Sequence, residues 1–398
     1  MYFKAISQEI STEQIKKHIT FLASDELKGR GTSTPDEVKA SEYIASEFKK
    51  LGLQAKGNDG YLYHFTFKKN PDPHDTSTVT LKERKARNVV GYIDNKASQT
   101  IIIGAHYDHL GLGEDGSSLD PKAEGKIHNG ADDNASGTSG VIELARYYSQ
   151  NKISEQYNML FMAFSAEELG LIGSKKYCEN PTIDFKNVNY MINMDMIGRL
   201  NDSTNKLMIY GVGTADEWIP LLDKYNNNVF SIKYDSSGIG PSDQTSFYLK
   251  NLPVLHFFTG QHSDYHKPTD DIDKINIAGE KKVLDYIIRI IAATEPLNKF
   301  NFKTTKSNEK DSPRFKVTLG IMPDYTFEGK GLKVDGVTEG KCGHRAGLLQ
   351  YDVIVKLGDY EVKNVQDYMV ALSKYSKGDT VKMKVTRKEI EQELTVTF

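Results

Sequence analysis

The chain has 398 residues, of which 38% are hydrophobic and 26% are charged. This length and composition are typical of a folded protein of about two to three domains, and they exclude a disordered chain. The 51 basic and 54 acidic residues leave a formal net charge of −3 without any basic block, which excludes the electrostatic footprint of a nucleic-acid-binding protein.

The N-terminal region predicts two amphipathic helices. Residues 12–24 place Ile15, Ile19 and Leu22 near one face, and residues 35–53 repeat apolar side chains at helical spacing. A glycine-rich turn separates them, and Ser, Thr and Asp residues at its end are typical helix N-caps.

The next region, up to residue 300, alternates apolar runs with helical stretches. The runs span residues 86–93, 100–108, 158–166, 188–195, 206–212 and 252–258. Several lack polar alternation, as expected of strands that are covered on both faces. Helical stretches at 136–150 and 270–294 separate some of them. The pattern predicts an α/β fold with a mixed, mostly parallel β-sheet between layers of helices.

The composition changes again after residue 300. Residues 301–313 are charged, rich in Ser and Thr, and end at a proline, which is typical of a linker. Residues 314–398 contain short alternating strands and two short helices. We therefore expect one domain at 1–300, a linker at 301–313 and a small β-rich domain at 314–398.

Acidic and histidine residues cluster where the apolar runs end or where a turn precedes a helix. They are His106, Asp108, Asp132, Asp133, Glu167, Glu168, Asp195 and His266. Open α/β sheets bind their ligands at the carboxyl ends of the strands, so we expect these side chains to meet at one edge of the sheet.

These residue types indicate a metal site. Imidazole nitrogens together with carboxylate oxygens are the ligand set of zinc or a similar ion, whereas Mg²⁺ and Ca²⁺ favour all-oxygen shells. A shared carboxylate is the simplest way to hold two cations about 3.5 to 4 Å apart. Two metal ions therefore fit the set of residues better than one.

Five segments resemble the motif series of the co-catalytic di-zinc aminopeptidases of the bacterial leucyl or general type. They are GAHYDHLG (104–111), GADDNASG (130–137), SAEELGLIGS (165–174), NMDMIGR (193–199) and DYHKPTDD (264–271). The resemblance implies a zinc exopeptidase fold with two Zn²⁺ ions per chain, bridged by Asp132. His106 and Asp195 would complete one site. Glu168 and His266 would complete the other.

The same resemblance implies that Glu167 is the general base. Adjacent residues at a strand end point in different directions, so Glu168 can face a metal ion while Glu167 faces the activated water. Tyr265 matches a family position that can donate a hydrogen bond to the tetrahedral oxyanion.

Further residues are candidates for supporting roles. Asp108 is well placed to orient the imidazole of His106, and Asp270 or Asp271 could orient His266.

Other residues near the motifs keep two interpretations. Asp133 either caps the helix that begins near residue 135 or acts directly in catalysis. His109 and His128 match no ligand position, so a structural or rim role is the main expectation. Gln244 stands where relatives often carry a second histidine, which alters hydrogen bonding in the substrate pocket. Arg199 either contacts the substrate or pairs with a carboxylate.

The C-terminal unit resembles a PDZ domain of the kind found in bacterial proteases. Leu319, Gly320, Ile321 and Met322 look like its carboxylate-binding loop. In such a loop, backbone N–H groups receive a C-terminal carboxylate while an exposed strand edge pairs with the peptide. The resemblance implies a C-terminal peptide as partner, and the alternative is a unit that only packs on the first domain.

Taken together, these features predict a metallo-aminopeptidase that acts on peptides with free N-termini. Dipeptidase, carboxypeptidase and glutaminyl cyclase chemistry on the same fold are the alternatives, and a pseudoenzyme with a working PDZ unit is a further one. No apolar run reaches the length of about 18 residues that a membrane span needs. Analogy with PDZ-bearing relatives suggests export to the periplasm or cell envelope after loss of a leader, with the cytoplasm as the other option.

Overall fold

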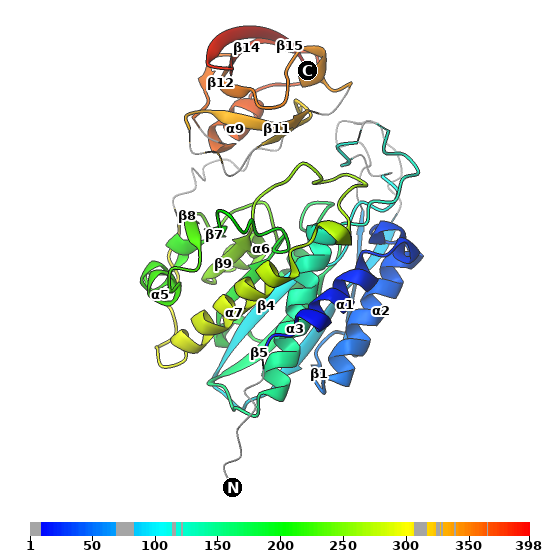
Figure 1. The fold of residues 1–398 in the computed structure, drawn as a ribbon, viewed down its shortest axis with the longest axis vertical. Helices are drawn as coiled ribbons and strands as arrows, with labels where there is room; N and C mark the ends of the chain where they lie inside the picture. Colours follow the sequence, from blue (N-terminus) through cyan, green and yellow to red (C-terminus); the bar gives the residue numbers. More distant parts are fainter. Residues whose placement is uncertain are drawn as a thin grey trace.

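The computed structural model describes residues 9–68, 83–113, 117–120, 122–305, 317–323, 327, 329–337, 340–363 and 365–398. Two separate β-sheets organise these residues, as the sequence predicts, and each carries its own helices (Figure 1).

The first sheet has nine strands in the order β1-β3-β5-β4-β6-β9-β7-β8, and β2 pairs with β3. The strands are β1 (Gln54–Ala55), β2 (Leu62–Lys68), β3 (Glu83–Ile93), β4 (Gln99–His106), β5 (Tyr157–Phe164), β6 (Val188–Met194), β7 (Lys206–Tyr210), β8 (Ser231–Asp235) and β9 (Val254–Phe258). The central strands β5, β4, β6 and β9 run parallel to one another, whereas β3 and β7 join them antiparallel. The prediction of a mixed, mostly parallel sheet is confirmed.

Helices cover both faces of this sheet. They are α1 (Thr12–Leu22), α2 (Pro35–Lys50), α3 (Gly137–Gln150), α4 (Ile172–Glu179), α5 (Trp218–Tyr225), α6 (Gln244–Tyr248) and α7 (Ile277–Thr294). Helices α1, α2, α3, α5 and α7 contribute to one apolar core, and α4 and α6 contribute to another on the opposite face (Figure 1). The first two helices match the predicted amphipathic segments at 12–24 and 35–53 within a few residues at each end.

The apolar runs are continuous because the strands that form them are covered on both faces. In β4, Ile101 and Ile103 pack in the first core, and Ile102 between them packs in the second. Successive side chains of a strand point to opposite faces, so a strand buried on both faces needs apolar residues at every position.

The second sheet is antiparallel, with the order β10-β11-β12-β14-β15 and β13 paired to β12. Its elements are β10 (Ile321–Pro323), β11 (Leu332–Val337), α8 (Cys342–Arg345), β12 (Val353–Leu357), β13 (Tyr360–Glu361), α9 (Val365–Leu372), β14 (Thr380–Arg387) and β15 (Ile390–Thr397). A third core, built only from residues between Val317 and Phe398, holds this unit together.

The described part of the predicted linker belongs to the first unit. Lys303 donates its amide hydrogen to the carbonyl of Thr214 at 2.8 Å, and Thr305 is hydrogen-bonded to Tyr248. Residues 306–313 lie outside the described residues. Among the described helices, none is long and apolar enough to cross a lipid bilayer.

Candidate metal centre

The predicted site residues come together at the carboxyl edge of the parallel strands. His106 is the last residue of β4, Glu167 and Glu168 follow β5, and Asp195 follows β6. His266 lies in the loop after β9. Asp132 and Asp133 lie in a kinked helical turn, Ala131–Ser136, directly before α3.

The first group of metal donors surrounds Nε2 of His106. This atom lies 3.3 Å from Oδ1 of Asp133 and 3.4 Å from Oδ1 of Asp195. Two donors of one tetrahedral zinc ion lie roughly 3.3 Å apart, because zinc–donor bonds are about 2.0 to 2.1 Å long. Both distances match this spacing, and the three donor atoms all lie within 4.8 Å of one another.

A second group of donors surrounds Nε2 of His266. This atom lies 3.3 Å from Oδ2 of Asp133 and 3.2 Å from Oε2 of Glu168. Asp133 therefore offers one carboxylate oxygen to each group of donors. One shared carboxylate between two donor groups is the arrangement that holds a pair of cations.

The prediction that Asp132 occupies the shared position is wrong by one residue. Oδ1 of Asp132 accepts the amide hydrogen of Gly198 at 2.7 Å, and Oδ2 lies 3.2 Å from Nε2 of His262. Asp133 does not cap α3 either, because the amide of Gly137 donates to the side chain of Asn134. Asp132 supports the turn, and Asp133 lies between the donor groups.

Glu167 and Tyr265 face the same small cavity as the donors. This cavity, of about 70 Å³, is lined by His106, Asp133, Glu167, Glu168, Asp195, Met196, Pro241, His256, Phe258, Gln261 and Tyr265. Oε2 of Glu167 lies 3.9 Å from Nε2 of His106. The ring of Tyr265 stacks on that of His266, with centroids 3.9 Å apart. Burial raises the pKa of Tyr265 well above its ordinary value, so its hydroxyl keeps its proton at neutral pH.

Of the predicted orienting residues, Asp108 lies next to its imidazole, with Oδ1 3.8 Å from Nδ1 of His106. Nδ1 of His106 lies 3.2 Å from the backbone carbonyl of Asp108, and the Asp108 carboxylate accepts hydrogen bonds from Thr32 and from the amide of Glu167. Nδ1 of His266 lies 3.0 Å from the backbone carbonyl of Ser117.

Asp270 binds the turn Ala131–Ser136, and none of its described hydrogen bonds reaches His266. Its Oδ2 accepts the amide hydrogens of both Asp132 and Asp133 at 3.0 Å. Backbone carbonyls thus orient both histidines, and a sequence carries no local signal for which carbonyl does so.

Two histidines that the motifs do not assign as ligands also contact this cluster. Nδ1 of His109 lies 2.8 Å from Oε1 of Glu168 and 3.9 Å from Oδ2 of Asp133, so His109 is a second imidazole that could join the donors around Glu168. His262 contacts Asp132 through Nε2. His128 lies farther out and pairs with the hydroxyl of Ser118.

Arg199 and Gln244 have partners inside the protein. Arg199 forms an ion pair with Asp264 at 3.2 Å, which supports the pairing interpretation of this residue. Gln244 is fully buried, and its side-chain oxygen lies 3.4 Å from Nδ2 of Asn193.

The electrostatics of the cluster place protons on the two histidines when no cation is present. Burial opposes a charge on His106, but Glu167 and Asp195 outweigh it and raise its pKa well above the ordinary value. Burial likewise opposes the ionisation of Glu168, yet the neighbouring His266 lowers the pKa of this carboxyl to about 2. A cation that binds here must displace these protons.

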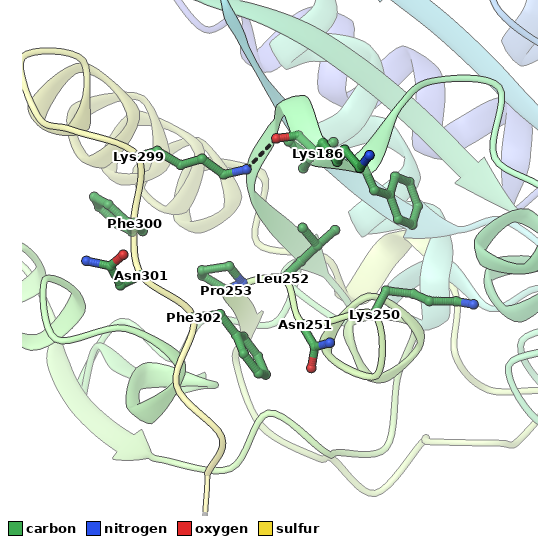
Figure 2. Close-up of a pocket in the computed structure, with 11 residues that line it drawn as sticks. Lys186, Lys250, Asn251, Leu252, Pro253, Lys299, Phe300, Asn301 and Phe302 are labelled. Carbon is green, nitrogen blue, oxygen red and sulfur yellow. Dashed lines mark hydrogen bonds between the residues drawn. The ribbon is translucent and has the colours of Figure 1, made fainter.

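A second cavity, of about 440 Å³, lies where β6 and β9 begin, away from the strand ends that carry the donors. Figure 2 shows its lining residues. It is bordered by the start of β6, the loop before β9 and the segment after α7, where Lys299 donates to the carbonyl of Lys186. None of its eleven described lining residues carries a carboxylate, imidazole or thiol. Of these two cavities, the one beside His106 and Asp133 is therefore the one that can support metal-assisted or acid–base chemistry.

Comparison with known proteins identifies the families that the two units resemble and the solved structures that share the fold. Residues 88–291 match the model of Peptidase family M28, and residues 300–398 match that of the PDZ domain. Aminopeptidase YwaD of Bacillus subtilis is 25% identical over 221 residues, which are 53% of this chain and 43% of that protein. The chain spans about half the length of the curated relatives it matches.

Solved structures share the fold of the first unit. An aminopeptidase from Aneurinibacillus sp. strain AM-1 has a TM-score of 0.56 at 19% identity and covers 75% of this chain and 96% of its own. A glutaminyl cyclase from Bacteroides thetaiotaomicron has a TM-score of 0.57 at 18% identity, with coverages of 71% and 98%.

Proposed function

Because this chain belongs to peptidase family M28, we propose that it is a zinc-dependent aminopeptidase that removes N-terminal residues from peptides. The observation that carries the proposal is the Asp133 carboxylate, which offers one oxygen to each of two groups of candidate donors and lines the same cavity as Glu167. The name of the Bacillus subtilis relative is consistent with this activity.

We assign two zinc ions to this site. Each donor group combines one imidazole nitrogen with two carboxylate oxygens at spacings of 3.2 to 3.4 Å, which is the chemistry and geometry zinc prefers. When bound, the ions would polarise the scissile carbonyl and lower the pKa of a water molecule.

In this proposal, Glu167 is the general base. It faces the cavity without being a member of either donor group, and burial raises its pKa well above the ordinary value of a glutamate in the metal-free protein. A carboxylate in this position takes a proton from the attacking water and passes it to the leaving amine.

Tyr265 stabilises the negative charge that develops on the carbonyl oxygen. Its stacking on His266 fixes the ring next to the second donor group, and its protonated hydroxyl is a hydrogen-bond donor at neutral pH. Met196 and Phe258 form an apolar wall of the same cavity, which favours substrates with an apolar N-terminal side chain.

We propose that the second unit binds the C-termini of peptides through residues Leu319 to Met322. Strand β10 lies at the end of the strand order and pairs with β11 on one side, so its other edge is available within the described residues. Gly320 has a φ of 68°, a left-handed conformation that glycine adopts without strain.

Export to the periplasm or cell envelope stays a prediction from the resemblance.

The test compares wild type with Glu167→Gln, using Glu179→Gln on the exposed side of α4 as the matched control. Wild type should contain two zinc ions per chain and release amine from leucyl-arylamide but not from its N-acetylated form. Glu167→Gln should keep both ions and lose about 10²- to 10⁴-fold in kcat. Glu179→Gln should match wild type.

Three results would contradict the proposal. Unchanged turnover in Glu167→Gln would remove the general-base role. Cleavage that ignores N-acetylation, or a single zinc ion per chain, would indicate carboxypeptidase or glutaminyl cyclase chemistry on this fold.

A further inference from the structure

Arg30 is a fully buried guanidinium at the base of the metal centre, with 0% of its surface exposed. Nε donates to the carbonyl of Tyr107 at 2.7 Å, and Nη2 donates to the carbonyl of Gly130 at 3.0 Å. Nη1 donates to the carbonyls of Leu22 and Asn129. One side chain thus binds four backbone carbonyls that come from three separate segments.

Two of these segments carry the metal donors. Tyr107 lies between His106 and Asp108, and the carbonyls of Asn129 and Gly130 come directly before the turn that holds Asp133. Because the five N–H groups of a guanidinium point in fixed directions within one plane, they set the relative positions of the carbonyls that they bind. The distance from His106 to Asp133 therefore depends on Arg30.

The backbone of Arg30 is itself attached to the same loop. Its carbonyl accepts the amide hydrogen of His109, and the carbonyl of Gly29 accepts that of Gly111. A Cβ at Gly29 would lie 2.4 Å from the carbonyl oxygen of His128, so glycine is required for this close approach. Arg30 consequently cannot move independently of the loop that follows β4.

Arg30 forms no ion pair within the described residues, so its hydrogen bonds to carbonyls account for its burial. Burial lowers the pKa of its guanidinium to about 10, while Asp133, Asp108 and nearby carboxylates oppose this change. The group remains charged at neutral pH. Burying a guanidinium without a paired carboxylate raises the free energy of the folded state. The four hydrogen bonds to backbone carbonyls offset this desolvation cost.

We propose that Arg30 is a positioning residue that holds the loop after β4 and the turn before α3 at the spacing both zinc ions need, before any ion binds. This inference rests on the proposed function in one respect, namely that the cluster binds zinc. Arg30 touches neither the cations nor the substrate and acts through the backbone.

The experiment measures zinc affinity of the metal-free protein by competition with a chelating dye, and its thermal unfolding, for wild type, Arg30→Lys and Leu27→Val. Lysine keeps the charge but lacks the planar fork, so zinc dissociation constants of Arg30→Lys should rise at least tenfold. Leu27, which is buried in the same segment, is the control for a general loss of stability. Leu27→Val should lower the melting temperature without changing zinc affinity.

If Arg30→Lys binds zinc as tightly as wild type but melts at a lower temperature, Arg30 only stabilises the fold and does not position the metal site. Wild type that binds no zinc would overturn the proposed function instead, so the two failures are distinguishable.

If Arg30→Lys does not fold, hydrogen exchange of the metal-free wild type tests whether the two loops are positioned before zinc binds. Prepositioned loops require that the amides of His109, Ala131 and Asp132 exchange as slowly without zinc as with it. Protection that appears only after zinc is added would contradict the inference.

Discussion

At the scale of single residues, Asp132 and Asp133 are neighbours with different partners. Asp133 points between His106 and His266, whereas Asp132 points to the amide of Gly198 and to His262. Replacing Asp133 with asparagine keeps one side-chain oxygen and turns the other into an NH2 group, so the residue can serve only one of the two donor groups. Removing the charge of Asp132 leaves both groups complete.

We expect Asp133→Asn to bind at most one zinc ion per chain at micromolar zinc and to lose measurable hydrolysis. Asp132→Asn should still bind two ions, with a lower melting temperature because its contact with His262 is weaker. Elemental analysis after gel filtration measures the first difference, and calorimetry measures the second. Two tightly bound ions in Asp133→Asn would exclude the shared-carboxylate arrangement.

The sequence predicts which segments form the site better than which atom of each segment faces it. Histidine and carboxylate residues at strand ends identify the edge of the sheet where the donors meet. The choice between Asp132 and Asp133 depends on a kinked turn, and a shift of one residue there reverses the direction of a side chain. The partners of His106 and His266 are backbone carbonyls, which every residue has and no sequence pattern can single out.

At the scale of elements, the sequence predicts the strands of the first sheet that are buried on both faces, but it does not predict strand β8 at the edge of that sheet. The run at 188–195 contains β6, whose seven residues are all buried. Strand β8 at the sheet edge has one exposed and four half-buried residues and includes Lys233 and Asp235, so it lacks a continuous apolar signal. Its pairing with β7 comes from the sheet and not from local propensity.

The turn that holds Asp133 begins at Gly130. The close packing around this glycine predicts that no larger residue fits there. Gly130 has a φ of 57°, and a Cβ there would lie 2.2 Å from the carbonyl oxygen of Asp133 and 2.5 Å from the ring of His109. Gly52 has a φ of 77°, and a Cβ added there would meet no atom within 4 Å, which makes it a matched control.

Gly52→Ala should cost about 1 to 2 kcal/mol, the penalty for a left-handed L-residue. Gly130→Ala should cost more than this and also weaken zinc binding, because the added methyl group displaces Asp133 or His109. Denaturant unfolding of the metal-free proteins and a zinc titration measure the two effects. Equal losses of stability with unchanged zinc affinity in both variants would show that the turn relaxes without moving Asp133.

At the scale of the whole molecule, the chain contains two units with separate cores. The described core residues of the first unit end at Phe302, and those of the second begin at Val317. The change in composition after residue 300 predicts this division. It does not predict that residues 301–305 pack on the first unit, because their contacts are backbone amides and one threonine hydroxyl.

These contacts determine where the chain can be cut. A chain that ends at Thr305 keeps the hydrogen bonds of Lys303 to Thr214 and of Thr305 to Tyr248, whereas a chain that ends at Phe300 loses them. Each lost hydrogen bond costs about 1 kcal/mol. We therefore expect the longer fragment to melt at the temperature of the first unit in the full chain and the shorter one to melt lower.

The longer fragment also tests what the second unit does for the peptidase. With its own core and a complete metal centre, it should bind two zinc ions and hydrolyse leucyl-arylamide with kcat/KM close to that of the full chain. If the second unit captures the C-termini of substrates, KM for peptides long enough to reach both units should rise on truncation, while KM for dipeptide analogues should not. An equal rise for both lengths would instead mean that the second unit supports the first only by packing, because a peptide too short to span both units cannot lose a contact with the second.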